Sequence, residues 1–316
     1  MSSVNKFTLS FGKISKKDVA QAGGKGASLG EMTSAKMPVP PGFMLTASAF
    51  DRFLDETDLF QDIQARLADV NYKDTNSVDK ASNVIRDMIH DVKFPADLRR
   101  EIMAEFKKLK APLVAVRSSA TAEDSKTASW AGELETYLNT TEKELIKNVK
   151  RCWTSLFTPR AIFYRHEKKL LKSKVSVAVV VQKMVQSEVS GITFTVHPVT
   201  QDKNQMIIEA GWGLGEAIVS GQITPDSYVI DKRDWSIMDI NISKQEQQII
   251  KTGKITKMTT VKKENQEKQK ISGKKIIELA KLCGQIEKHY KFPCDIEWAL
   301  ERGKLYITQS RPITTL

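Results

Sequence analysis

Residues 294–312 have the sequence CDIEWALERGKLYITQSRP, in which two runs with alternating apolar residues flank a turn containing Gly303. This pattern predicts a β-hairpin. Glu297 in the first run, and Gln309 and Arg311 in the second, are polar residues among Ile, Trp, Leu and Tyr. Gln309 and Arg311 share one face because side chains alternate along a strand. A carboxylate and an amide offer hard oxygen ligands for Mg²⁺ and an arginine suits a phosphate, so the hairpin is a candidate metal and phosphate site. The alternative is an ordinary Glu–Arg pair across a hairpin, which contributes little to stability.

The segment that precedes the hairpin is rich in predicted strands. VSVAVVVQKMV (residues 175–185) predicts a central strand, and further β-type runs, punctuated by Gly and Pro, fall within residues 191–232. Among them, GWGLGEA (residues 211–217) has part of a dinucleotide-binding glycine pattern, but its sixth position is Glu216 instead of glycine. The lysine-rich stretch from 243 to 275 has two β-like runs and no aromatic residue on which a base could stack. A solvated strand pair therefore explains it better than a nucleic-acid surface does.

The amino-terminal half carries two further segments that suit phosphate binding. GGKG (residues 23–26) precedes a predicted helix, where glycines allow close backbone approach, terminal N–H groups favour anions and the lysine adds charge. A plain glycine-rich turn is the alternative. LVAVRSS (residues 113–119) predicts a buried strand that leads into a long loop of small residues, and Arg117 with the hydroxyls beside it can bind phosphate oxygens. PADLRREIMAEFKKLK (residues 95–110) predicts a surface helix from the helical spacing of its apolar residues.

Composition limits the class of protein. The chain has 316 residues, of which 41% are hydrophobic and 28% charged, the balance of an ordinary soluble globular protein. A length above roughly 250 residues favours two lobes over a single core. With 49 Lys and Arg against 38 Asp and Glu, the net charge of +11 favours anionic partners without separating nucleotide from nucleic acid. No apolar stretch approaches the roughly 20 residues of a membrane span and the amino terminus lacks a signal-type core, so we expect a cytoplasmic protein without a membrane partner.

Three cysteines, Cys152, Cys283 and Cys294, have unrelated spacings and no nearby histidine that would complete a zinc site. A reduced thiol in a protein interior behaves as a small apolar side chain. We therefore expect reduced, buried thiols at all three positions.

The motifs occur in the order found in one family. From about Lys13 to Ile313 the chain contains, in turn, GGKGASLGEM, PVPPGFMLT, VAVRSSATAED, AGELETYLN, VVVQKMV, GITFTVHP, GWGLGEAIVSGQITPD and the hairpin. This series resembles the nucleotide-binding domain shared by phosphoenolpyruvate synthase (pyruvate, water dikinase), pyruvate phosphate dikinase and rifampin phosphotransferase. The resemblance implies an α+β, ATP-grasp fold in which two lobes clasp Mg-ATP. The expected lobes are residues 1–190 and a β-rich part, residues 191–316.

The resemblance also implies catalytic and metal-binding roles. Lys25 and Arg117 look like ligands of the ATP phosphates, and Arg311 like the residue that reaches the terminal phosphates. Glu297 and Gln309 resemble the magnesium ligands of the family, so ATP is the expected substrate and Mg²⁺ the expected cofactor. Phosphoryl transfer depends mainly on positioning and on neutralising phosphate charge, so the domain needs no covalent nucleophile of its own.

The remaining candidate residues are implied to bind the rest of the nucleotide or to cover its phosphates. Gly132 and Thr136 fall in the phosphate-covering loop, and Glu216 matches a residue at the ribose. The strand that meets adenine would contribute Gln182, Lys183, Met184 and Val185.

Two positions depart from the family pattern. WAGELET places Glu133 and Leu134 where two amides are common, and an extra carboxylate close to phosphates would add repulsion. His197 stands where the TxNP turn frequently has asparagine.

The resemblance implies that the phosphate acceptor is a histidine outside this sequence. Full-length dikinases pass the phosphate to a histidine on a mobile carrier domain. None of the four histidines has that carrier setting, and we expect all to be structural or solvated: His90, His166, His197 and His289. The expected function is an ATP-dependent phosphotransferase component that releases AMP and phosphorylates a carrier-histidine domain or subunit in trans.

Other interpretations stay open at this point. The chain is equally similar to the corresponding part of a rifampin phosphotransferase, and a free-standing subunit is known in phenylphosphate synthase and in split dikinases. A subunit that senses ATP without turnover is a non-enzymatic alternative, and the matched Lys, Arg, Glu and Gln positions argue against it. We do not expect nucleic acid as a partner.

Overall fold

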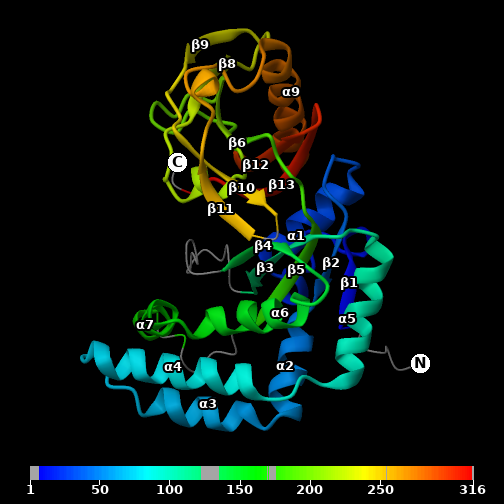
Figure 1. Cartoon of the computed structure of the whole chain (residues 1–316), viewed down its shortest axis with the longest axis vertical. Helices are drawn as coiled ribbons and strands as arrows, with labels where there is room; N and C mark the ends of the chain where they lie inside the picture. The colour runs from blue at the N-terminus through cyan, green and yellow to red at the C-terminus, as the bar shows by residue number, and fades with distance from the viewer. Residues whose placement is uncertain (1–6, 122–134, 169, 171–175, 254, 315–316) are drawn as a thin grey trace. The chain divides into compact units, whose positions relative to one another are not determined.

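The computed structural model describes residues 7–121, 135–168, 170, 176–253 and 255–314. By its contacts the chain forms two compact units (Figure 1). Unit 1 comprises Met1–Ser34 and Pro41–Met184, and unit 2 comprises Ala35–Pro40 and Val185–Leu316. The expected domains, residues 1–190 and 191–316, stay a prediction, because contact density does not establish that either part folds alone.

Unit 1 is built on a five-stranded antiparallel sheet with the order β1-β2-β5-β3-β4. The valine-rich strand β5 (Val177–Lys183) lies in the middle, and all of its residues except the last are buried. β-Branched side chains suit this position because they pack well on a pleated surface that is covered on both faces. The other strands are β1 (Thr8–Ser10), β2 (Gly42–Leu45), β3 (Val114–Ala120) and β4 (Thr136–Thr140).

Helices cover both faces of this sheet. α1 (Val19–Ser34) packs against β3 and β5 on one face, and α2 (Ala47–Glu56) and α6 (Leu145–Thr154) pack on the other (Figure 1). Phe53 of α2 and Trp153 of α6 are fully buried in this second layer, with ring centroids 4.9 Å apart. The remaining helical segments of unit 1 are η1 (Phe11–Lys13), α3 (Leu59–Ala68), α4 (Thr75–Asp91), α5 (Ala96–Leu109), η2 (Ser155–Phe157) and α7 (Pro159–Glu167). The helix predicted over residues 95–110 is confirmed as α5.

Unit 2 is built on a six-stranded antiparallel sheet with the order β13-β12-β6-β7-β8-β9. α9 (Gly273–Tyr290) packs against β12 and β7. The strands are β6 (Val189–Phe194), β7 (Gln205–Trp212), β8 (Asp226–Asp231), β9 (Ile237–Asn241), β12 (Cys294–Glu301) and β13 (Lys304–Pro312).

The hairpin predicted over residues 294–312 is confirmed as β12 and β13. Its turn residues, Arg302 (φ +50°) and Gly303 (φ +74°), both adopt the left-handed conformation that a tight two-residue turn requires. The lysine-rich stretch forms the antiparallel pair β10 (Gln247–Thr252) and β11 (Ile255–Thr260), in which most described residues are exposed or half-buried, as predicted. The short segments of unit 2 are α8 (Glu216–Val219) and η3 (Lys263–Asn265).

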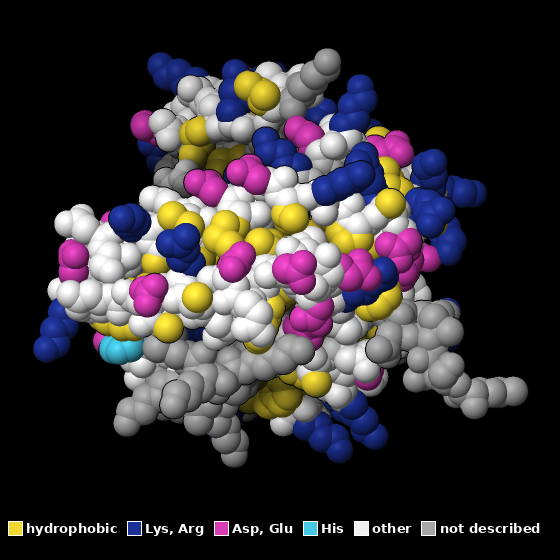
Figure 2. Space-filling model, turned by 90° about the horizontal axis from the view of Figure 1, so that it is seen from below, with side chains coloured by type: hydrophobic (Ala, Val, Ile, Leu, Met, Phe, Trp, Pro, Cys, Tyr) yellow, Lys and Arg dark blue, Asp and Glu magenta, His cyan; other side chains and the backbone are white. Residues whose placement is uncertain are grey.

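The mixture of helices and sheets confirms the predicted α+β class. Cys152, Cys283 and Cys294 are free and buried, and burial raises the pKa of each thiol. Within the described part of the chain, no helix has the length and hydrophobicity needed to cross a membrane. On the face shown in Figure 2, Lys and Arg side chains are interspersed with Asp and Glu side chains.

Candidate functional site

The GGKG segment and strand β3 meet at Ser119. α1 is interrupted at Gly23, which has φ +66° and ψ 174°, a conformation open essentially to glycine alone. Ser119 Oγ donates to the carbonyl of Ala22 (2.9 Å) and accepts from the N–H of Gly26 (3.3 Å). A Cβ atom on Gly23 would lie 2.2 Å from the same Oγ. The GGKG segment and the end of β3, the two phosphate-binding candidates of unit 1, therefore lie side by side. The Ser119 side chain connects them through its hydrogen bonds to α1.

The candidate side chains of unit 1 gather on the face of the sheet that α1 covers. Arg117 lies two residues before Ser119 on β3, and so shares its face. Thr136 of β4 lies directly opposite Arg117, and residues opposite each other across an antiparallel pair point to the same face. Gln182 of β5 pairs with Ala115, two residues before Arg117, and is on this face as well. Arg117 and Gln182 are buried, whereas Thr136 is exposed.

The end of β5 differs from its prediction. The strand was expected to continue to Val185, but it ends at Lys183. The reason lies in β2, which is preceded by Pro40 and Pro41, and prolines have no N–H with which to extend the ladder. Lys183 N–H still donates to the carbonyl of Pro41 (2.8 Å), and Met184 N–H donates to the carbonyl of Leu113 (3.0 Å). The adenine candidates Lys183 and Met184 thus belong to unit 1 and Val185 to unit 2.

The hairpin of unit 2 brings four polar residues to one face. Glu297 lies directly opposite Gln309, and Asp295 directly opposite Arg311. Arg311 Nε and Nη2 both contact Asp295 Oδ2, at 2.8 and 2.7 Å. The arginine therefore pairs with Asp295 across the hairpin. Asp295 was not predicted, although its spacing of two residues from Glu297 indicates the shared face.

Negative charge is concentrated on this face. The row that contains Gln309 and Glu297 continues through Ile192 of β6 to Glu209 of β7. Burial raises the pKa of Glu209, and the charge of Asp295 raises it further. Burial also raises the pKa of Asp295, Arg311 opposes that shift, and Glu297 adds to it. Such a face favours a bound cation, which would offset the repulsion among its carboxylates.

Glu216 lies at the end of a separate glycine-rich turn. It is the first residue of α8, directly after the sequence GWGLG. Gly213 in this turn has φ +90°, and a Cβ atom there would lie 2.5 Å from the carbonyl oxygen of Ile249. The side chain of Glu216 reaches solvent, while desolvation by its surroundings raises the pKa of its carboxyl group. Gly132, the remaining candidate, and its neighbour Glu133 lie outside the described residues.

Comparison with known proteins identifies the family. Residues 19–316 match the family model of the pyruvate phosphate dikinase AMP/ATP-binding domain. The chain belongs to this family. The probable phosphoenolpyruvate synthase of Methanocaldococcus jannaschii is 46% identical over 98% of this chain, and the phosphoenolpyruvate synthase of Pyrococcus furiosus is 43% identical over 97% of it.

The chain spans less than half the length of these relatives, 27% of the first and 43% of the second. A D-alanine–D-alanine ligase from Bacillus anthracis aligns with 69% of this chain and 56% of its own, at 8% identity and a TM-score of 0.26, which is too low to assign a fold. The ATP-grasp assignment accordingly follows from membership of the dikinase ATP-binding family.

The donor set of this dikinase ATP-binding domain fits Mg²⁺. Glu297 and Gln309 present a carboxylate and an amide oxygen from directly opposite positions. Among the described residues, no group of three or more His, Cys, Asp or Glu side chains is arranged to hold a metal by itself. Mg²⁺ commonly takes only one or two protein ligands and completes its shell with phosphate and water oxygens, so two protein oxygens suffice.

Two of the histidines in this dikinase ATP-binding domain have structural contacts. His197 Nδ1 accepts from the N–H groups of Val199 and Thr200, both at 3.2 Å. Asparagine commonly makes such bonds in turns, which explains how histidine replaces it in the TxNP motif. The ring of His166 stacks on Tyr72 with centroids 3.8 Å apart. Both contacts agree with the expected structural role.

Proposed function

We propose that the chain is the ATP-binding, phosphoryl-donating component of a dikinase, which transfers a phosphoryl group from ATP to a histidine on another domain or subunit and releases AMP. The observation that carries the proposal is the hairpin register, which sets Glu297 against Gln309 and Asp295 against Arg311 on one face. Two hard oxygen donors beside an arginine suit the phosphates of a metal-bound nucleotide. Membership of the dikinase AMP/ATP-binding family supports the same assignment.

In this proposal each candidate residue has a defined task. Glu297 and Gln309 hold Mg²⁺, which when bound neutralises charge on the phosphates. Lys25 and Arg117 bind phosphate oxygens, and Arg311 exchanges its contact with Asp295 for the terminal phosphates. Phosphoryl transfer of this kind rests on positioning and on electrostatic stabilisation.

The rest of the nucleotide is bound by the other candidates. Gln182, Lys183, Met184 and Val185 contact adenine, and Gly132 and Thr136 cover the phosphates. Glu216 accepts hydrogen bonds from the ribose hydroxyls, a task for which a carboxylate is suited because it is an acceptor only.

The phosphoryl groups have two acceptors. On the way from ATP to AMP, one group goes to the carrier histidine, and the other goes to water or phosphate. The names of the relatives favour phosphoenolpyruvate as the eventual product, since the relatives from Methanocaldococcus jannaschii and Pyrococcus furiosus are phosphoenolpyruvate synthases.

Product analysis tests the proposed function. The chain is incubated with Mg-ATP, with and without a carrier-histidine domain from a phosphoenolpyruvate synthase, and AMP, ADP and phosphate are separated by chromatography. AMP should form only with the carrier domain, and Arg311→Ala should abolish it while ATP binding is largely kept. Lys304→Ala, which removes an exposed cation from the same strand, is the matched control and should leave AMP formation unchanged. Rapid ADP formation by the chain alone would contradict the proposal and point to a self-sufficient kinase or ATPase.

A further inference from the structure

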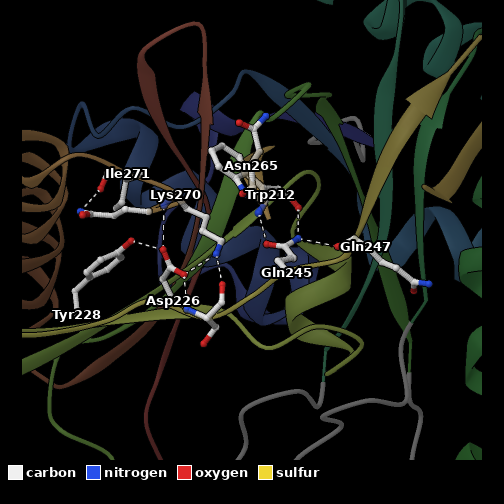
Figure 3. Close-up of polar contacts among 10 residues, drawn as sticks. Trp212, Asp226, Tyr228, Gln245, Gln247, Asn265, Lys270 and Ile271 are labelled. Carbon is white, nitrogen blue, oxygen red and sulfur yellow. Dashed lines mark hydrogen bonds and ion pairs between the residues drawn. The ribbon is translucent and has the colours of Figure 1, made fainter. Parts of the chain in front are cut away.

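Between β9 and α9 the chain leaves the six-stranded sheet and forms an excursion, residues 242–272, which contains β10, β11 and η3. This excursion contacts the end of β7 and the short helix α8. Figure 3 shows two sets of polar contacts made by the excursion, one around Asp226 and one around Trp212. The second set reaches Trp212, where the glycine-rich turn before Glu216 begins.

The base of the excursion is fixed by a buried ion pair. Lys270 Nζ lies 2.7 Å from Asp226 Oδ1, and both side chains are completely buried (Figure 3). Asp226 also accepts from the N–H groups of Ser243 and Lys270 (both 3.0 Å) and from the hydroxyl of Tyr228 (2.8 Å). The entry and exit of the excursion, at Ser243 and Lys270, are therefore held by one carboxylate. A buried ion pair adds little net stability, but it permits few alternative arrangements.

Gln245 connects the excursion to the start of the glycine-rich turn. Its Oε1 accepts from the N–H of Trp212 (2.8 Å), and its Nε2 donates to the carbonyl of Trp212 (3.0 Å) and to that of Gln247 (2.9 Å) (Figure 3). The side chain is buried, so an unmade bond at any of these groups would be costly. Trp212 is held a second time, because its Nε1 donates to the carbonyl of Asn265 (3.0 Å).

Gly213 and Leu214, the next residues of the turn, make hydrogen bonds both to the excursion and to the six-stranded sheet. Leu214 N–H donates to the carbonyl of Ile249 in β10 (2.8 Å), and the carbonyl of Gly213 accepts from Ser190 Oγ of β6 (2.7 Å). Gly213 itself approaches Ile249 so closely that no side chain fits. Glu216 follows Leu214 by two residues, with only Gly215 between them, so its position depends on these bonds.

We infer that Gln245 is a positioning residue: it fixes the conformation of the Trp212–Gly215 turn so that the Glu216 carboxylate accepts hydrogen bonds from the ribose hydroxyls of the nucleotide. The inference rests on the proposed function, since it takes the ligand of Glu216 to be the ribose. Gln245 acts through Glu216 and the turn, without touching the nucleotide.

Nucleotide discrimination tests this inference. Dissociation constants are measured by calorimetry for ATP and for 2′,3′-dideoxy-ATP, both with Mg²⁺, on the full chain and on Glu216→Gln, Gln245→Ala and the double variant. Wild type should bind ATP roughly tenfold more tightly than the dideoxy analogue, the value of hydrogen bonds to a charged group. Gln245→Ala and Glu216→Gln should each reduce that ratio towards one, and the double variant should reduce it no further than Glu216→Gln alone.

Two further variants separate positioning from general destabilisation. Gln269→Ala is the matched control, because its Nε2 bonds only the carbonyl of Ile271 within the excursion, and it should keep the full ratio. Gln245→Asn keeps the amide on a side chain one methylene shorter and adds no charge to the buried site, so it is the milder variant and should give an intermediate ratio.

The inference is overturned if Gln245→Ala keeps the wild-type ratio while Glu216→Gln loses it, since the turn would then not depend on Gln245. A full ratio in Glu216→Gln would instead show that the ribose assignment under the proposed function is wrong, and the inference would fail with it. A wild-type chain that binds neither nucleotide would overturn the proposed function itself.

Discussion

Gly23 combines a left-handed backbone with a contact to Ser119 that leaves no room for a side chain. Gly23→Ala should therefore lower the free energy of unfolding by about 2 kcal/mol or more, through backbone strain and overlap together. It should also weaken ATP binding, because Lys25 follows two residues later. Chemical denaturation measures the first effect. Gly12→Ala is the control, since nothing lies within 4 Å of a Cβ atom there. Equal stability of the two variants would contradict the role given to Gly23.

Glu209 makes the stability of unit 2 depend on pH. Its folded-state pKa is raised, first by burial and then by Asp295, so the folded protein binds its proton more tightly than the unfolded chain does. The contribution of Glu209 to the free energy of unfolding is therefore present at acid pH, and it is lost as the pH rises through the pKa that Glu209 has in the folded protein. Glu209→Gln should be more stable than wild type at pH 7, and the difference should shrink as the pH is lowered. Urea denaturation across this range measures it, and a difference that grows towards acid pH would contradict the assignment.

At the scale of single residues, sequence reasoning identified candidate ligands and missed residues that contact them. Glu297, Gln309 and Arg311 stand out because they are polar in otherwise apolar strands. Asp295 was overlooked because a lone carboxylate at the start of a strand has many ordinary explanations, and only the register shows that it faces Arg311. The hydroxyls beside Arg117 were expected to bind phosphate, and the bonds of Ser119 to α1 could not be predicted because their partners lie more than 90 residues earlier in the chain.

At the scale of elements, the Asp226–Lys270 pair attaches the excursion to the sheet. Lys270→Met should lower the free energy of unfolding by about 3–5 kcal/mol, because it leaves the Asp226 carboxylate buried without its counter-charge. Adding Asp226→Asn should recover part of that loss, since the second change removes the carboxylate charge that Lys270→Met leaves without a partner. Denaturation of both single variants and the double variant gives the coupling. Additive losses would contradict the account of a coupled pair.

The hairpin, α5 and β5 were predictable because their apolar periodicity is strong and their turn or flanking residues are distinctive. The end of β5 could not be predicted. The strand stops where the neighbouring strand β2 is preceded by proline, which has no N–H to donate, and β2 lies about 140 residues away in the sequence. The excursion was predicted as a solvated strand pair, and this is confirmed. Its attachment through Gln245 and Lys270 could not be predicted, since both look like ordinary surface residues in a lysine-rich stretch.

At the scale of the whole molecule, the candidate phosphate and metal ligands are divided between the two units. Lys25 and Arg117 belong to unit 1, and Glu297, Gln309 and Arg311 to unit 2. The candidate ligands were identified from the order of the motifs, because no composition or periodicity argument relates segments almost 300 residues apart. Our central proposal is that binding of one Mg-ATP depends on both sets of candidate residues.

Calorimetric titration of wild type, Lys25→Ala and Gln309→Ala, each with Mg-ATP and with metal-free ATP, tests that claim most directly. Wild type should bind one nucleotide per chain. Lys25→Ala should weaken binding of both forms because it removes a phosphate ligand, whereas Gln309→Ala should weaken Mg-ATP alone because it removes a metal ligand. Unchanged Mg-ATP affinity in either variant, or an equal loss of both forms in Gln309→Ala, would contradict the claim.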